Sequence, residues 1–307
     1  MSEPDPMTEV HRFGGIDCTQ GGQAPGGGGG DDFAMATWEA TLGEFDPVYL
    51  RRLVRFTGPT AAASSGIIHR EKQLWGHTLV GMDPGGGGIG VREELRHVEQ
   101  TYNGRPLLGV TPLVTREDAG LAGIGMPNLF FVGPGDSLIK EVITEPMSGS
   151  SWLPNKLHSL FLGGLDNGRI VFPPLWEGWD KLNLVGRITG HGGKRGLGQE
   201  IEMAGYDPEL MRRLLNDAVG LGDEERTRAE MDLAVLQLLQ IDVAKDPDTK
   251  MRKQDRYGLF QFTSKEAKDS AYAMIYGYFT VWIWREYVKK SGWGRKPKGI
   301  VVDSEVV

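Results

Sequence analysis

Cysteine, surplus basic charge and long apolar runs are all scarce in this chain of 307 residues. The single cysteine, Cys18, excludes an intramolecular disulfide, so nothing in the sequence requires an oxidising compartment. Lysine and arginine number 34 against 41 aspartates and glutamates, which gives a formal net charge of −7. A general nucleic-acid binder needs a basic surface that displaces counterions from phosphate. The charge balance therefore predicts no general nucleic-acid binding.

The longest apolar run, residues 271–284, is shorter than the roughly 20 residues that cross a bilayer. No membrane span is expected from it. Residues 1–10 lack the cationic start and apolar run of a signal peptide. We therefore expect cytoplasmic synthesis without a cleavable signal peptide, followed by retention in the cytosol, incorporation into a virion, or export by a non-classical route.

Clusters of metal-binding side chains are also missing from the sequence. The six histidines are scattered, none forms a His-x-x-x-His pair, and one cysteine cannot build a thiolate zinc site. The sequence predicts no metal and no cofactor.

Glycine is abundant, with 45 residues, and its distribution sets the expected domains. Residues 1–32 contain the unbroken run Gly26 to Gly30 and no periodicity, which predicts a flexible glycine-rich arm. A loop-rich mixed domain is expected over residues 33–198, a helical domain over 199–297 and a tail over 298–307. The predicted fold class is α+β, with an irregular glycine-rich N-terminal part carrying short strands and a mainly α-helical C-terminal part.

Capping residues and periodicity predict the individual elements. Asp46 and Pro47 have the N-cap and first-turn signature of a helix, which would end at Gly58. Short strands are expected within residues 67–80, at 129–132 and at 139–143. Helices are expected at residues 91–100, 207–220, 224–245 and 263–292.

The run from Tyr257 to Thr263 follows an amphipathic segment and a polar loop and precedes a capped apolar segment. Its Gly-Leu-Phe-Gln-Phe core resembles the Gly-Leu-Met-Gln-Ile-like signature of lysozyme-like lytic transglycosylases and muramidases, over about residues 236–271. The resemblance implies a lysozyme-like C-terminal part that acts on or binds peptidoglycan glycan strands. The acid of that family is a glutamate, whereas this chain has Asp242 nearby and one residue out of register. The site is therefore either a relocated glycosidase site or a catalytically degenerate one.

Glycosidic cleavage requires a carboxylic acid held protonated in a low-dielectric cleft. The resemblance assigns this general-acid role to Asp242, and it assigns the shaping of the cleft to three motif residues, Tyr257, Gln261 and Thr263. The structural alternative is that Gly258 permits a tight turn and Gln261 bonds to loop backbone.

Two tryptophans in the middle of the chain are candidates for substrate binding. Trp176 and Trp179 lie among glycine, aspartate and proline residues, and their faces would stack on pyranose rings. The alternative interpretation is that both anchor loops to the core.

A second stretch, residues 79–85, is a short apolar run that ends in Asp83-Pro84-Gly85. It resembles the first metal-binding strand of ribonuclease-H-like nucleases. That resemblance implies that Asp83 ligates Mg²⁺ with another carboxylate, such as Glu141 or Asp166. Those nucleases continue into another strand, whereas this chain enters a run of glycines, and Asp-Pro-Gly is a common turn sequence. We therefore interpret the stretch as a turn.

Two functional hypotheses follow from the sequence. The first is a lysozyme-like glycosidase with a glycan polymer as its partner. The second is a non-enzymatic structural or assembly protein, such as a virion or secretion-apparatus component, whose glycine-rich arm and loops contact protein subunits. In the second case the subunits include other copies of the chain in a homo-oligomer.

Overall fold

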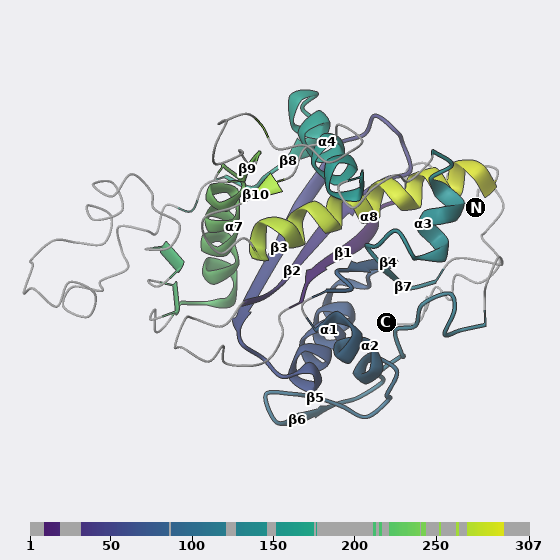
Figure 1. The fold of residues 1–307 in the computed structure, drawn as a ribbon. Coiled ribbons are helices and arrows are strands. Elements are labelled where there is room, and N and C mark those ends of the chain that lie inside the picture. The colour runs from purple at the N-terminus through teal and green to yellow at the C-terminus, as the bar shows by residue number, and fades with distance from the viewer. Residues whose placement is uncertain are drawn as a thin grey trace, which may run out of the picture.

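A six-stranded sheet forms the centre of the chain, with the strand order β7-β4-β1-β2-β3-β8 (Figure 1). The computed structural model describes residues 9–18, 32–85, 87–120, 127–145, 152–174, 176, 211–212, 215–216, 221–239, 241–243, 252, 262–263 and 269–291. The strands of the sheet are β1 (His11–Asp17), β2 (Asp32–Ala40), β3 (Val48–Thr57), β4 (Leu79–Met82), β7 (Leu129–Phe131) and β8 (Ile170–Val171).

The strand directions divide the sheet into two parts. β1, β2 and β3 form an antiparallel meander, whereas β4 pairs with β1 in parallel and β7 pairs with β4 in parallel. β8 adds to the other edge, parallel to β3. The helix α1 (Ala61–Trp75) connects β3 to β4, as a parallel crossover requires. The junction of β1 and β4 is therefore the place where two parallel strands end side by side in the middle of the sheet.

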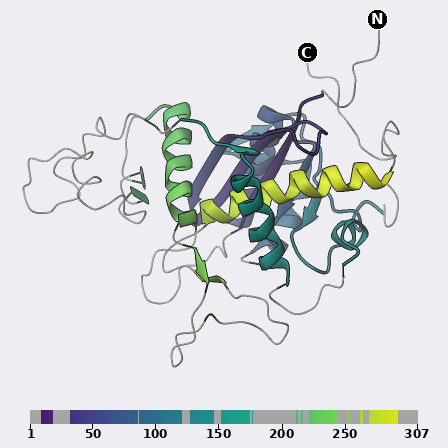
Figure 2. The same cartoon turned by 90° about the horizontal axis from the view of Figure 1, so that it is seen from above.

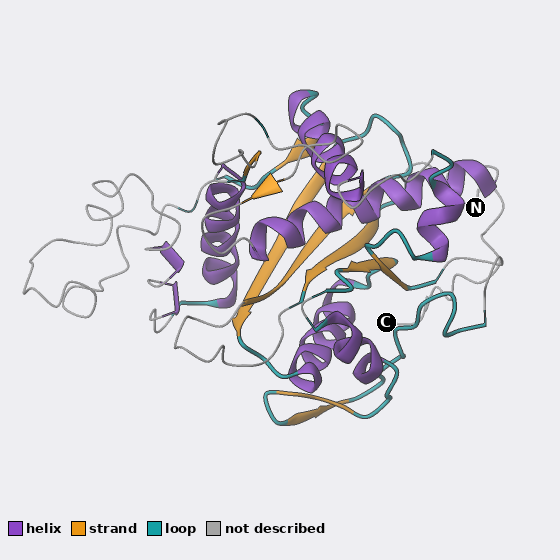
Figure 3. Cartoon of the chain, viewed as in Figure 1, coloured by secondary structure: helices purple, strands orange, loops and turns teal. Residues whose placement is uncertain are grey.

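Helices cover both faces of the sheet (Figure 3). On one face, α1 and α2 (Gly88–Leu95) share a buried cluster with the strands that includes Ile16, Met35 and Val80. On the other face lie α3 (Ser137–Val142), α4 (Trp152–Asp166) and α8 (Asp269–Ser291). Their cluster includes Phe13, Trp38 and Phe130. Because neighbouring strand residues point to opposite faces, β1, β2, β3, β4 and β7 each supply buried residues to both cores.

The long helix α8 lies directly against β1 and β2 (Figure 2). Glycines make this close approach possible: a Cβ atom on Gly15 would overlap the backbone of Gly277 and Ala273, and one on Gly277 would overlap the ring of Trp38. The Trp38 indole N–H donates to the carbonyl of Met274 at 3.1 Å. No helix among the described residues is long and apolar enough to cross a membrane, α8 included.

Buried arginines attach α7 (Asp223–Leu239) to β3. The Arg55 guanidinium donates to Glu230 of α7 at 2.8 Å and to Asp32 of β2 at 2.6 Å, and all three side chains are almost fully buried. Removing one member of such a buried network leaves uncompensated charge, which typically costs about 3–5 kcal/mol. The network therefore holds α7 on the sheet.

Two short two-stranded ribbons complete the described elements. β5 (Gln100–Tyr102) pairs with β6 (Arg105–Leu107), and β9 (Asp242–Val243) pairs with β10 (Phe262–Thr263).

The prediction of a mixed α and β fold is confirmed, but several elements differ from the sequence expectation. Residues 11–17, assigned to the flexible arm, form the strand β1, which has a neighbour on each side. The stretch after Asp46-Pro47 is the strand β3, because its apolar residues are buried on both faces of the sheet and only resemble a helical stripe. The expected strand at 139–143 is α3, capped by Asp136. The strand at 129–132 is confirmed as β7.

Most of residues 67–80 also differs from the expected strands. Residues 61–75 form α1, and Thr60 caps this helix by accepting a hydrogen bond from the N–H of Ala63 at 3.2 Å. Only the last part of the range, from Leu79, is a strand. The expected helix at 207–220 lies largely outside the described residues.

Acid is expected to destabilise the fold through His77. Its Nε2 lies 2.9 Å from Thr37 Oγ1, and burial, helped by Lys72 and Arg12, lowers its pKa to about 3. In the unfolded chain the His77 imidazole binds a proton near pH 6.5, whereas in the folded chain it does so only near pH 3. The free energy of unfolding therefore falls as the pH drops from 6.5 towards 3. We expect this one histidine to lower the free energy of unfolding by about 2.5 kcal/mol between pH 7 and pH 4.5.

Urea denaturation of the intact chain and of His77→Gln at the two pH values measures this contribution. The variant should lose most of that difference, whereas His97→Gln, at an exposed position, should keep it. Equal pH dependence in all three proteins would contradict the prediction.

Candidate metal centre

Two aspartates stand side by side where the parallel strands β1 and β4 end. Ile16 is paired with Met82, and the Asp83 N–H donates to the Ile16 carbonyl at 3.0 Å. Asp17 is the last residue of β1, and Asp83 directly follows β4. The sheet register therefore brings together two carboxylates that are 66 positions apart in the chain.

Both carboxylates belong to the face of the sheet that α8 covers. A Cβ atom on Gly15 would meet Gly277, and one on Gly81 would meet the Thr280 hydroxyl, so these two positions face α8. Side chains alternate along a strand, so Asp17 and Asp83, each two residues further on, point to the same side. Both are half-buried.

Two tyrosine hydroxyl groups of α8, those of Tyr272 and Tyr276, experience the negative charge of both aspartates. Burial raises the pKa of Tyr272 to about 12, and Asp17 and Asp83 add to this increase. The pKa of Tyr276 is raised well above its usual value by the same causes. Burial, Asp17 and Asp83 likewise raise the pKa of the Cys18 thiol. The aspartates thus form one centre of negative potential, with neutral hydroxyl and thiol groups around it.

Further contacts hold the groups around this centre. The Asp83 carboxylate accepts a hydrogen bond from the N–H of Gly85 at 3.0 Å, so the predicted turn is present. That bond involves Oδ1, and it leaves acceptor capacity on the carboxylate. On the α8 side, the Tyr272 hydroxyl lies 3.3 Å from Nε2 of His158, a buried residue of α4. The turn and a metal-binding role of Asp83 are therefore compatible.

The carboxylates that the sequence suggested as partners of Asp83 lie elsewhere. Glu141 is paired with Arg116, and Asp166 is exposed at the end of α4. Asp136, which follows the neighbouring strand β7, is engaged as the cap of α3 and accepts from the N–H of Leu138 at 2.8 Å. Over the described ranges, no group of three or more histidine, cysteine, aspartate or glutamate side chains could hold a metal ion. The centre is thus a pair of carboxylates.

A pair of carboxylates suits Mg²⁺ better than the other common ions. Mg²⁺ usually binds proteins through one or two carboxylates and completes its shell with water and substrate phosphates. Ca²⁺ takes more oxygen ligands, and Zn²⁺ prefers nitrogen and sulfur. The donor set of Asp17 and Asp83 therefore fits a magnesium ion.

The residues of the expected glycan site are only partly within the described chain. Asp242 and Thr263 are paired in the ribbon of β9 and β10. Tyr257, Gln261 and Trp179 lie outside the described residues. Trp176 is 8% exposed, and its backbone N–H donates to the Asp232 carboxylate at 3.0 Å, which favours the core-anchoring alternative for this residue.

Asp17 was missed in the sequence because it precedes a long glycine-rich stretch. The signal that identifies it is a repeated local pattern: Gly15-Ile16-Asp17 matches Gly81-Met82-Asp83. In both, glycine faces α8, the apolar residue enters the opposite core and the aspartate follows.

No family model matches the chain, and no curated protein matches it in sequence. Two solved structures are similar to it: the large terminase nuclease from thermophilic phage G20c, and that nuclease with bound magnesium. Each is 12% identical, with a TM-score of 0.40, and the match covers 90% of this chain and 84% of the other.

Neither similar structure is a lysozyme-like protein, and the described chain is organised around a six-stranded sheet. The lysozyme-like prediction, with its peptidoglycan substrate and glycosidase activity, is therefore wrong. The lysozyme-like prediction was based on the short motif of residues 257–263, and a run of this length does not determine a fold. The expectations of a glycan partner and of no general nucleic-acid binding are corrected with it, and both similar structures are described as nucleases.

Proposed function

We propose that this chain is a magnesium-dependent nuclease whose metal-binding residues are Asp17 and Asp83. The observation that carries the proposal is the meeting of the two carboxylates at the ends of β1 and β4. The resemblance of residues 79–85 to the metal-binding strand of ribonuclease-H-like nucleases supports it, because that strand works with a second carboxylate.

The electrostatics of the pair favour a functional interpretation. Two carboxylates that share a site repel each other, and partial burial increases the cost of keeping both ionised. A bound divalent cation would offset the repulsion between Asp17 and Asp83.

A magnesium ion bound here would act as a Lewis acid on a phosphate oxygen of the substrate. Asp17 and Asp83 would hold it from two strands whose relative position the sheet sets. Tyr272 and Tyr276 stay protonated near neutral pH, because their pKa values are raised. They therefore present neutral hydroxyl groups to the site, and the contact of Tyr272 with His158 holds one of these rings in place.

The acidic net charge of −7 is compatible with a nucleic-acid substrate. Net charge is a sum over the whole molecule, whereas phosphate contacts depend on the local field. A phosphodiester group that completes the shell of a bound magnesium ion meets positive charge at the site itself. The sequence argument against nucleic acid considered surface charge alone and did not include a metal ion.

A cleavage assay tests the proposal directly. Supercoiled plasmid DNA and a structured RNA would be incubated with the full chain in Mg²⁺, in Mn²⁺, in Ca²⁺ and in a chelator. We expect cleavage in Mg²⁺ or Mn²⁺ and none in the chelator. Absence of cleavage of both substrates in both ions, by folded protein, would refute the nuclease.

A binding measurement separates the metal site from the activity. Terbium bound at Asp17 and Asp83 would lie near Tyr272 and Tyr276, so excitation of the aromatic rings should sensitise its luminescence. Addition of Mg²⁺ should displace it. A chain that shows no sensitised luminescence would contradict the proposed metal site, whatever its activity.

A further inference from the structure

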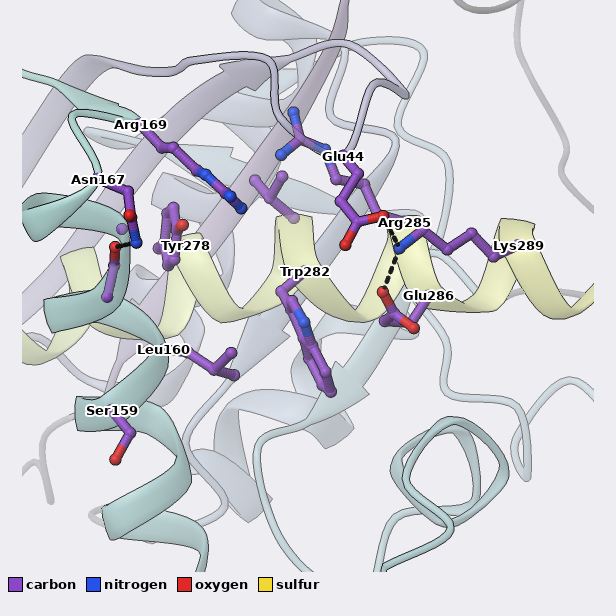
Figure 4. A pocket seen from close by; sticks show the side chains of 13 residues that line it. Glu44, Ser159, Leu160, Asn167, Arg169, Tyr278, Trp282, Arg285, Glu286 and Lys289 are labelled. Carbon is purple, nitrogen blue, oxygen red and sulfur yellow. Dashed lines mark hydrogen bonds and ion pairs between the residues drawn. The ribbon is translucent and has the colours of Figure 1, made fainter.

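A cavity of about 210 Å³ opens between α4, α8 and the turn that joins β2 to β3 (Figure 4). Its volume lies below the roughly 300–1,000 Å³ of sites that enclose a whole drug-sized ligand. A cavity of this size suits a small group. Its lining contains three cationic side chains, Arg169, Arg285 and Lys289, and two anionic ones, Glu44 and Glu286.

The charges of the cavity are divided between two ends. At one end, Lys289 Nζ lies 2.8 Å from a carboxylate oxygen of Glu44 and 2.8 Å from one of Glu286, so this lysine is neutralised (Figure 4). The other end holds Arg169, Arg285 and the Tyr278 ring. The excess positive charge therefore lies at the arginine end.

Arg285 is held in position by backbone. Its guanidinium is buried, and it donates through Nε to the Thr41 carbonyl at 3.0 Å and through Nη2 to the Asp46 carbonyl at 3.3 Å. These bonds use two of the five N–H donors of an arginine. Three N–H donors of the Arg285 guanidinium remain, and this side chain lines the cavity.

Arg169 is presented by the turn after α4. Gly168, with φ of 63°, ends that helix, and Arg169 follows just before β8. Its guanidinium stacks over the Phe45 ring at 4.7 Å, and within the described residues it has no hydrogen-bond or ion-pair partner. Burial lowers the pKa of Arg285. Tyr278 and Asp46 oppose this decrease and Arg169 adds to it, so the two arginines are close enough to repel.

We propose that this cavity binds a phosphate group through the guanidinium groups of Arg169 and Arg285. A planar guanidinium matches two phosphate oxygens with parallel N–H donors, and two such groups enclose one anion from two sides. The Tyr278 hydroxyl lies beside them as a further donor. The bound anion would offset the repulsion between the arginines. The Glu44 carboxylate is paired with Lys289 at 2.8 Å, and this lysine, with smaller contributions from Arg169 and Arg285, lowers the pKa of Glu44.

The alternative is a purely structural role, in which Arg285 holds the β2–β3 turn and Arg169 shields Phe45, a ring that is 72% exposed. Arg51 provides a matched control for this alternative. It is an exposed arginine that stacks over Tyr49 at 4.8 Å and lies outside the cavity lining. Arg51→Gln and Arg169→Gln thus remove the same charge and the same kind of stacking contact, and Arg51→Gln also removes an ion pair with Glu39 at 2.7 Å.

Isothermal titration calorimetry without divalent cations tests the proposal on the full chain. The three probes are inorganic phosphate, a 5′-mononucleotide and a short single-stranded oligonucleotide, with chloride at equal ionic strength as the blank. We expect Arg169→Gln to weaken phosphate binding by about 10- to 100-fold, since hydrogen bonds to charged groups are lost. Arg51→Gln should bind as the intact chain does, and Arg169→Lys, which keeps the charge but not the planar fork, should lie between.

Equal affinity for the three probes would identify a site for free phosphate, and a preference for the oligonucleotide that depends on Arg169 would identify a site for a backbone phosphate. Both results support a phosphate site. No binding of any probe, or an equal loss in Arg169→Gln and Arg51→Gln, would overturn it. The titration needs neither magnesium nor Asp17, so its failure would leave the proposed nuclease unaffected.

Discussion

Asp17→Asn is expected to lower magnesium-dependent cleavage by at least about a hundredfold. Asn keeps the shape of the side chain but removes the charge that binds the ion, and even residues that only support metal ligands typically cost 10- to 100-fold. Asp83→Asn should have a similar effect, because the two carboxylates occupy equivalent places at the ends of β1 and β4. The measurement is the initial rate of DNA cleavage at saturating Mg²⁺.

Stability measurements distinguish loss of the site from loss of the fold. Removing one of two adjacent like charges relieves the repulsion between them. The free energy of unfolding of Asp17→Asn in urea, in the absence of metal, shows whether the variant keeps the fold. Asp166→Asn, at an exposed position at the end of α4, is the matched control and should cleave normally. Full activity in Asp17→Asn would exclude this aspartate as a metal ligand.

Gly15→Ala is expected to destabilise the protein strongly. The added Cβ atom would overlap backbone atoms of Gly277 and Ala273, and neither helix backbone nor strand backbone can rotate away as a side chain can. Overpacking of a core usually costs about 1–3 kcal/mol, and a contact between two backbones belongs at or beyond the upper end of that range. The measurement is the free energy of unfolding in urea.

Gly163→Ala is the matched control for the loss of a glycine. Gly163 lies within α4, and a Cβ atom there would meet nothing within 4 Å. Alanine favours a helix over glycine by up to about 1 kcal/mol, so this variant should be neutral or more stable. A small effect of Gly15→Ala, comparable to that of Gly163→Ala, would show that α8 does not lie as close to β1 as described.

Local sequence signals predicted the elements whose stability depends mainly on neighbours in the chain. The α7 segment has acidic residues in its first turn and apolar residues at helical spacing, and β7 is a short apolar run. The α8 segment was predicted as a buried helix from its apolar composition. The mixed α and β class followed from these elements together.

The strands β1 and β3 could not be predicted in the same way. β1 contains glycine because α8 approaches it closely. Local propensity assigns glycine to loops, whereas here the packing of α8 on the strand requires it. The apolar residues of β3 resemble the apolar stripe of a helix. Both faces of this strand are buried, so its sequence lacks the alternation of apolar and polar residues that is typical of a strand with one exposed face.

The sequence by itself determined the composition, the charge balance and the carboxylate at the end of residues 79–83, together with that stretch's resemblance to a metal-binding strand. Only the tertiary structure decided which second carboxylate meets Asp83, because Asp17 reaches it through the parallel pairing of β1 and β4. The same holds for Arg169 and Arg285, which come from different elements and meet only when α4 and α8 pack together. Contacts between distant residues depend on register and packing, and neither is encoded in any short segment of the chain.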